Sequence, residues 1–112
     1  MDLYSPRKIM FKAWNKETKL LMRLNTIDCK KGELFKKDHI LLQFTGLYDK
    51  QRDEVYEMDV LLMGMEKYLV LWDAERNGWM LTHLDRATSE PLLTHTLANA
   101  VRLCSFFEME KK

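Results

Sequence analysis

Hydrophobic and polar residues alternate along most of the chain, and this pattern predicts short β-strands rather than helices. The alternation is clearest over residues 67–73, where Tyr68, Val70 and Trp72 share one face of the predicted strand. The same criterion predicts further strands over residues 8–14, 20–27, 39–45, 60–63, 79–83 and 101–107. So many short strands indicate an antiparallel, mainly β protein.

Polar segments between the strands predict the turns. Residues 15–18, Asn-Lys-Glu-Thr, favour a hairpin between the first two strands, because asparagine opens turns well. Asn77-Gly78 is a second strong turn signal. Residues 84–96, which contain Pro91, are expected to form a loop, and residues 96–100 are expected to form one helical turn before the last strand.

A polar connector at residues 47–54 is the main candidate for a domain boundary. We therefore divide the chain into an N-terminal β segment of a hairpin plus a strand, residues 1–53, and a C-terminal module, residues 54–112. A length of 112 residues suits one domain, or two small modules that share one core. We expect the two parts to pack as one unit.

Composition excludes several classes of protein. With 46% hydrophobic and 31% charged residues, the chain has an ordinary globular balance rather than that of a disordered protein. No apolar run approaches the roughly 20 residues of a membrane-spanning helix, and the first residues lack the apolar stretch of a secretory signal. The two cysteines, Cys29 and Cys104, lie far apart and indicate neither a disulfide scaffold nor a zinc site. We expect a soluble cytoplasmic protein without a cofactor.

Charge is distributed unevenly along the chain. Residues 1–37 contain ten basic and four acidic residues, a net charge of +6, whereas residues 38–112 contain eight basic and thirteen acidic residues, a net charge of −5. The basic part is suited to a nucleic-acid backbone. It is equally suited to contact with the acidic part of the same chain or of a neighbouring copy. A third interpretation is that the lysines are solvated and protect strand edges from pairing with other strands.

Two motifs resemble the YopX family, small proteins found mostly in bacteriophages, prophages and mobile elements of bacteria. Residues 11–19, Phe-Lys-Ala-Trp-Asn-Lys-Glu-Thr-Lys, are similar to the family's opening F-R-A-W-D-K-E-T-K. Residues 42–50, Leu-Gln-Phe-Thr-Gly-Leu-Tyr-Asp-Lys, and residues 54–60, Glu-Val-Tyr-Glu-Met-Asp-Val, are similar to its longer signature. Looser similarity extends the resemblance to residues 8–108.

The resemblance implies a five-stranded SH3-like barrel at the C-terminus, preceded by an N-terminal β segment, and a tendency to assemble. It implies no catalytic or ligand-binding residues. Arg52 and Met58 stand where the family usually has glycine. Because a turn with positive φ resists such replacements, we expect the two turns that flank Tyr56 to differ in shape here.

Candidate chemistry is sparse. His83 and Asp85 have the spacing of two metal ligands, but no further ligand is visible, and a surface histidine is the simpler interpretation. Cys104 with a histidine would make a nucleophile, although its place in a strand favours a small buried side chain. The acids Glu54, Glu57 and Asp59 fit turn capping or surface solvation better than a carboxylate dyad. We expect no enzymatic activity.

Binding is therefore the expected mode of action. Trp14 shares a face with Lys12, which makes it the best candidate for a partly exposed aromatic side chain at an interface. The leading hypothesis is a non-enzymatic accessory protein of a phage or mobile element that self-associates and acts on a protein of the bacterial host, such as a defence component. The alternative is a nucleic-acid-binding accessory protein. The candidate binding residues are Arg7, Lys8, Lys12, Trp14, Lys16, Lys19 and Arg23.

Overall fold

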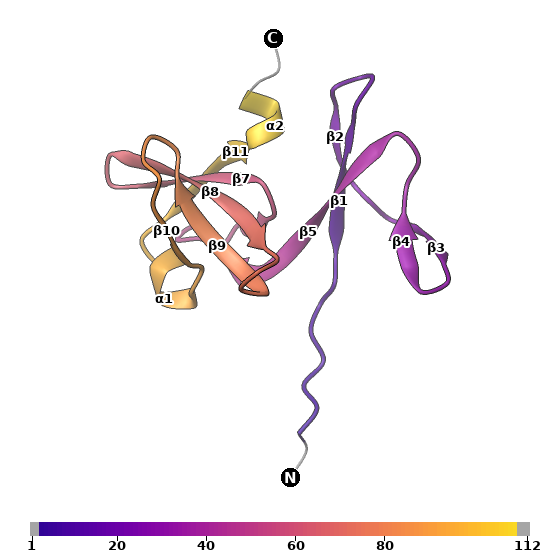
Figure 1. Cartoon of the computed structure of the whole chain (residues 1–112), viewed down its shortest axis with the longest axis horizontal. Helices are drawn as coiled ribbons and strands as arrows, with labels where there is room; N and C mark the ends of the chain where they lie inside the picture. The colour runs from indigo at the N-terminus through magenta and orange to yellow at the C-terminus, as the bar shows by residue number, and fades with distance from the viewer. Residues whose placement is uncertain (1–2, 110–112) are drawn as a thin grey trace.

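The computed structural model of the chain describes residues 3–109, which form three antiparallel β-sheets and two short helices (Figure 1). This confirms the mainly β fold that the alternating pattern predicts. Residues 3–10 form no strand and lead as an extended segment into the first sheet (Figure 1). We call this stretch the N-terminal segment.

Six strands make up the part that we call the N-terminal lobe. Their bounds are β1 Phe11–Asn15, β2 Leu21–Arg23, β3 Asp28–Lys30, β4 Glu33–Phe35, β5 His39–Tyr48 and β6 Glu54–Tyr56. Four of them form one sheet in the order β2-β1-β5-β6, and β3 pairs with β4 in a separate hairpin. Asn15 closes the predicted turn between β1 and β2, because its Oδ1 accepts hydrogen bonds from the backbone N–H groups of Glu17 and Thr18 at 2.9 and 3.0 Å.

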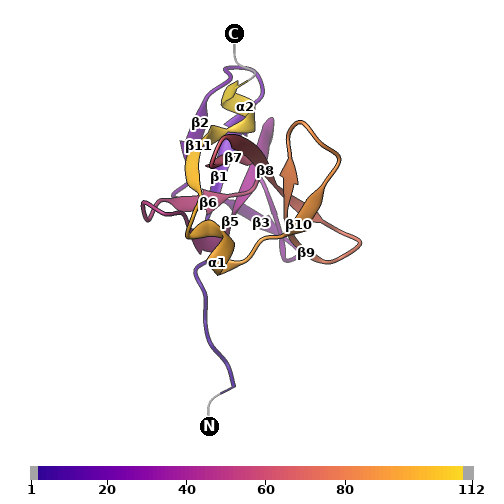
Figure 2. The same cartoon turned by 90° about the vertical axis from the view of Figure 1, so that its left-hand side faces the viewer.

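The remaining elements form the C-terminal lobe, which is seen from another side in Figure 2. Its elements are β7 Asp59–Met63, β8 Glu66–Asp73, β9 Gly78–His83, β10 Ser89–Pro91, α1 Thr94–Leu97, β11 Val101–Ser105 and α2 Phe106–Met109. The first four strands follow one another as a meander, and β11 returns to pair with β7, which gives the sheet order β10-β9-β8-β7-β11.

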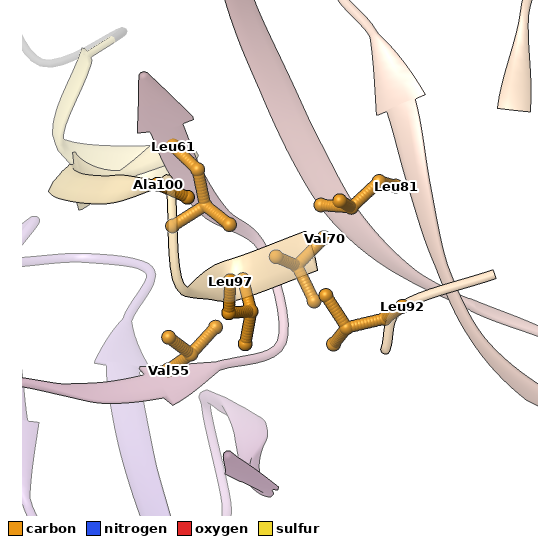
Figure 3. Close-up of a cluster of buried hydrophobic side chains, with 7 residues drawn as sticks. All are labelled: Val55, Leu61, Val70, Leu81, Leu92, Leu97 and Ala100. Atoms are coloured by element: carbon orange, nitrogen blue, oxygen red, sulfur yellow. The ribbon is translucent and has the colours of Figure 1, made fainter. Parts of the chain in front are cut away.

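Seven buried side chains form the hydrophobic core of the C-terminal lobe (Figure 3). They are Val55, Leu61, Val70, Leu81, Leu92, Leu97 and Ala100. Burial of such apolar side chains is the main favourable term in folding. Val55 belongs to β6, so the last strand of the N-terminal lobe contributes to this core. The boundary placed between residues 53 and 54 stays a prediction.

Two predicted segments are corrected by the structure. The strand expected over residues 20–27 is shorter, since β2 ends at Arg23. The loop expected over residues 84–96 contains β10, which pairs with β9. Pro91 is tolerated in β10 because an edge strand has hydrogen-bonding positions that face no partner.

The last predicted strand, residues 101–107, is also too long. It ends at Ser105, and α2 begins at the next residue. Glu108 Oε1 accepts a hydrogen bond from the Ser105 backbone N–H at 2.9 Å, and Ser105 Oγ accepts one from the Phe107 N–H at 3.4 Å. This reciprocal pair is a capping box, which starts a helix where the alternating pattern alone predicts continued strand.

Arg52 and Met58 adopt the left-handed conformation that glycine favours, with φ of 70° and 68°. Both positions hold positive φ with an L side chain, at a cost of about 1–2 kcal/mol for each residue. The expected difference in shape from the turns of the family stays a prediction.

Candidate functional site

Four of the predicted basic residues are exposed and form no ion pair among the described residues, and they lie in two groups rather than in one patch. Arg7 and Lys8 lie on the N-terminal segment, and Lys16 and Lys19 lie in the β1–β2 turn. These positions are at opposite ends of β1 (Figure 1). A five-residue strand spans about 16 Å, so one short ligand does not contact both groups. Within residues 3–109, no ion pair involves any of the four.

The other two predicted basic residues have partners inside the protein. The Lys12 ammonium lies 4.4 Å from the ring centroid of Tyr56, and burial lowers the pKa of Lys12, with a further contribution from the charge of Arg102. Arg23 forms an ion pair with Glu54. Lys12 and Arg23 therefore have a role in holding β1 and β2 against β6.

Trp14 is not an exposed aromatic side chain, and this corrects the prediction. Only 5% of the residue is exposed, and its ring stacks on that of Phe107, with centroids 5.5 Å apart and an interplanar angle of 23°. The expectation was wrong because it inferred exposure from the face that Trp14 shares with Lys12, whereas Lys12 is itself partly buried and α2 carries the Phe107 ring onto Trp14. Trp14 is part of the packing and does not provide a platform for stacking bases.

The hairpin of β3 and β4 is a surface that the sequence analysis did not identify. All six residues of these strands are exposed, including Leu34 at 42% and Phe35 at 45%. Leu34 and Phe35, with Lys30, Lys31 and Glu33, line a shallow hollow of about 460 Å³. An isolated two-stranded hairpin is at best marginally stable in water, so this one gains from any partner that covers it.

Asp49 connects the turn after β5 to the start of β11. Its Oδ1 accepts hydrogen bonds from the backbone N–H groups of Gln51 and Asp53, both at 2.8 Å, and its Oδ2 accepts one from Arg102 N–H at 2.7 Å. The Lys50 N–H donates to the carbonyl of Ala100 at 2.8 Å. This turn is therefore fixed by contacts to a segment about 50 positions later in the chain.

Asp59 forms the other half of this junction. It is buried and accepts hydrogen bonds from Tyr56 N–H and from Arg102 Nε, both at 2.8 Å. Burial raises the pKa of the Asp59 carboxyl, while the hydrogen bond and charge of Arg102 oppose that rise. Asp59 thus caps a turn, as expected, but it is buried rather than on the surface. Glu54 forms an ion pair with Arg23, so Glu54 and Asp59 both have structural partners.

The histidine and cysteine candidates also have local roles. His83 is buried, and its Nδ1 accepts a hydrogen bond from the Asp85 backbone N–H at 3.0 Å, so the pair forms a turn. His83 Nε2 lies 3.4 Å from Glu66. Burial raises the pKa of the Cys104 thiol, with a further rise from the Glu108 carboxylate, which disfavours the thiolate that a nucleophile needs. Among residues 3–109 no group of three metal-ligating side chains gathers.

The fold defines a small, mainly β protein, and exposed apolar side chains lie on both of its lobes. The family model of the YopX protein matches residues 8–100. The chain therefore belongs to the YopX family, as its two motifs indicate.

A solved structure has the same fold. The crystal structure of protein EF1440 from Enterococcus faecalis superimposes with a TM-score of 0.66 at 15% sequence identity, covering 92% of this chain and 96% of that one. No curated protein matches the sequence. Neither of the two short helices in the described residues has the length and apolar character needed to cross a membrane.

Proposed function

We propose that this protein is a non-enzymatic accessory protein that acts by protein–protein interaction and assembles with copies of itself through its N-terminal lobe. The observation that carries the proposal is the β3–β4 hairpin, with Leu34 and Phe35 exposed on a two-stranded sheet. Apolar side chains on such an element gain most from burial against another protein surface.

Charge supports a second copy as the first partner. The first 37 residues have a net charge of +6 and the rest of the chain a net charge of −5. Opposite charges on two parts of one chain guide the encounter and orientation of two copies, while the apolar contacts of the hairpin supply the affinity, so the assembly is expected to persist when salt is added. Arg7, Lys8, Lys16 and Lys19 are exposed and available for such a contact.

Nucleic-acid binding is the second candidate, since the same four exposed basic residues are suited to phosphate groups. Their separation on opposite ends of β1 and the burial of Trp14 favour the protein partner. The two candidates differ in their response to salt, because phosphate contacts release counterions and apolar contacts do not.

The family supports the setting that we propose. YopX-family proteins occur mostly in phages, prophages and mobile elements, so we place this one in the cytoplasm of a bacterial host, with a host protein, such as a defence component, as its further partner. We also propose that the C-terminal lobe is an SH3-like five-stranded barrel module. A short helix, α1, precedes the last strand, β11, and β11 lies beside the first strand of the lobe, β7. This arrangement supports the assignment.

Light scattering on the purified protein tests the function. We expect a mass that is a multiple of 13.4 kDa, unchanged between about 50 and 200 mM salt and unchanged by added DNA and RNA. A monomer that gains mass with nucleic acid only at low salt would instead establish the second candidate.

A pair of matched double variants locates the interface. Leu34→Ser with Phe35→Ser is expected to reduce the mass to that of a monomer. Leu93→Ser with Leu103→Ser changes two side chains of equal exposure, 45% and 42%, in the C-terminal lobe and is expected to leave the assembly intact. Equal behaviour of the two variants would exclude the hairpin as the interface.

A further inference from the structure

A hollow of about 330 Å³ lies where the N-terminal segment, β5 and the β6–β7 turn meet strands β8 and β9. We call it the tryptophan hollow. Five residues line it, each from a different stretch of the chain, so the hollow exists only in the folded protein. They are Arg7, Gln43, Glu57, Trp72 and Trp79.

The two tryptophans form its aromatic wall. Trp72 and Trp79 are directly opposite each other in the β8–β9 pair, and their rings meet edge to face, with centroids 4.9 Å apart and an interplanar angle of 76°. Trp79 packs against the hydrophobic core and is thereby fixed in place. Trp72 is 44% exposed, which leaves indole surface available to a ligand. The face of an indole ring attracts cations more strongly than other aromatic rings do.

Glu57 supplies a carboxylate beside this wall. Two hydrogen bonds join Glu57 to Gln43 of β5. The Glu57 backbone N–H donates to the Gln43 carbonyl at 2.8 Å, and the Gln43 N–H donates to Glu57 Oε1 at 3.4 Å. Burial raises the pKa of Glu57, against the opposing effect of this hydrogen bond. In the part of the chain that the structure describes, Glu57 forms no ion pair. A half-buried carboxylate without a charged partner gains free energy when a cation binds.

The size of the hollow and the presence of Arg7 indicate which cation fits. A volume of about 330 Å³ is at the lower end of ligand pockets and suits one side chain rather than a larger molecule. Arg7 lines the hollow from a segment outside any strand, so an arginine of the chain itself already lies beside the site. A planar guanidinium stacks on an indole ring and also donates two hydrogen bonds to a carboxylate, which an ammonium does not do.

We propose that the tryptophan hollow binds the guanidinium group of an arginine side chain from a partner protein, stacked on Trp72 and hydrogen-bonded to Glu57. Arg7 of the chain itself competes with this ligand in the free protein. The inference rests on the proposed function, since it takes a partner protein to supply the arginine.

Binding of a small probe tests the site without the partner. The probe is the tripeptide Gly-Arg-Gly with acetylated and amidated ends, added to the full chain while the indole N–H signals are followed by NMR. We expect the signals of Trp72 and Trp79 to shift with a Kd on the order of 1 mM, and the buried Trp14 signal to stay unchanged. The same peptide with citrulline, a neutral analogue of arginine, is expected not to bind. Equal binding of both peptides would overturn the proposal.

Variants identify the groups that act. Glu57→Gln keeps the shape of the side chain and is expected to weaken arginine-peptide binding at least about tenfold. Glu17→Gln makes the same change in the exposed β1–β2 turn and is expected to leave the Kd unchanged. Arg7→Ala, an exposed position where folding is not at risk, is expected to tighten binding a few-fold. An unchanged Kd in both Glu57→Gln and Arg7→Ala would exclude the site.

The result separates this inference from the proposed function. A protein that assembles with copies of itself but does not bind the arginine peptide would show that the hollow is not the site, and the interaction function would stand. A protein that binds the peptide but remains a monomer would contradict assembly and leave the arginine site in place.

Discussion

The two lobes differ in the size of their strands and in how many of their apolar residues are fully enclosed. The C-terminal lobe completely encloses Val70 on β8, Leu81 on β9 and Leu97 on α1. In the N-terminal lobe, four of the six strands have three residues, and Leu34, Phe35 and other apolar side chains are exposed. We therefore expect the C-terminal lobe to supply most of the stability, while the contact surface that we propose lies on the N-terminal lobe. Replacements of the same kind should therefore have very different effects in the two lobes.

The largest expected effect tests this difference directly. Leu81→Ala removes a fully buried side chain and is expected to lower the free energy of unfolding by about 3–4 kcal/mol. Leu20→Ala makes the same change at a position of the N-terminal lobe that is 52% exposed and lies outside the proposed interface, and it is expected to cost less than about 0.5 kcal/mol. Urea unfolding followed by tryptophan fluorescence measures both values. Similar losses in the two variants would refute the division of roles.

The next effect concerns the junction between the lobes. Arg102→Met removes the cation that is hydrogen-bonded to Asp59 and leaves a buried carboxylate with only Tyr56 N–H as hydrogen-bond donor and Lys12 as a nearby charge, so we expect a loss of about 3 kcal/mol. Adding Asp59→Asn removes the uncompensated charge and is expected to restore most of the loss. Urea unfolding of the single and double variants decides the point, and a double variant no more stable than Arg102→Met would contradict this account.

The smallest effect concerns the turn between β5 and β6. Arg52 has a φ of 70° and its guanidinium lies 5.4 Å from the ring centroid of Tyr48. Both Arg52→Gly and Arg52→Ala remove the contact with the Tyr48 ring. Only glycine adopts the positive φ at this position without steric strain. We expect the glycine variant to be about 0.5–1 kcal/mol more stable than the alanine variant by thermal unfolding. The reverse order would mean that the positive φ carries no strain.

The sequence predicts the regular strands well and the irregular ones poorly. Residues 67–73 are predicted within one residue of β8, because their alternation is strict and both neighbouring strands pair with them. For β5 the prediction stops at Thr45, since Gly46 is a common strand terminator. Gly46 instead lies within the strand with a φ of 88°, at the point where the pairing register with β6 shifts. It therefore forms a β-bulge, and the strand continues beyond it.

The contacts of the candidate sites also divide into local ones, which the sequence predicts, and distant ones, which it does not. The Asn15 turn is predictable because its hydrogen bonds are local. The capping box of Ser105 and Glu108 is also local and visible in the sequence as Ser-x-x-Glu, and reading it would have placed Phe107 on a helix. In contrast, Arg7, Glu57 and Trp72 meet only through the packing of distant segments, and no spacing in the sequence indicates that they do.

The stacking of Phe107 on Trp14 has a consequence for the protein as it is made on the ribosome. The two residues are 93 positions apart, so at about 5–20 residues per second Trp14 is synthesised roughly 5–20 s before the ring that covers it. During that interval Trp14 lacks the ring that stacks on it in the folded protein. The N-terminal lobe therefore completes its packing only after α2 has been synthesised.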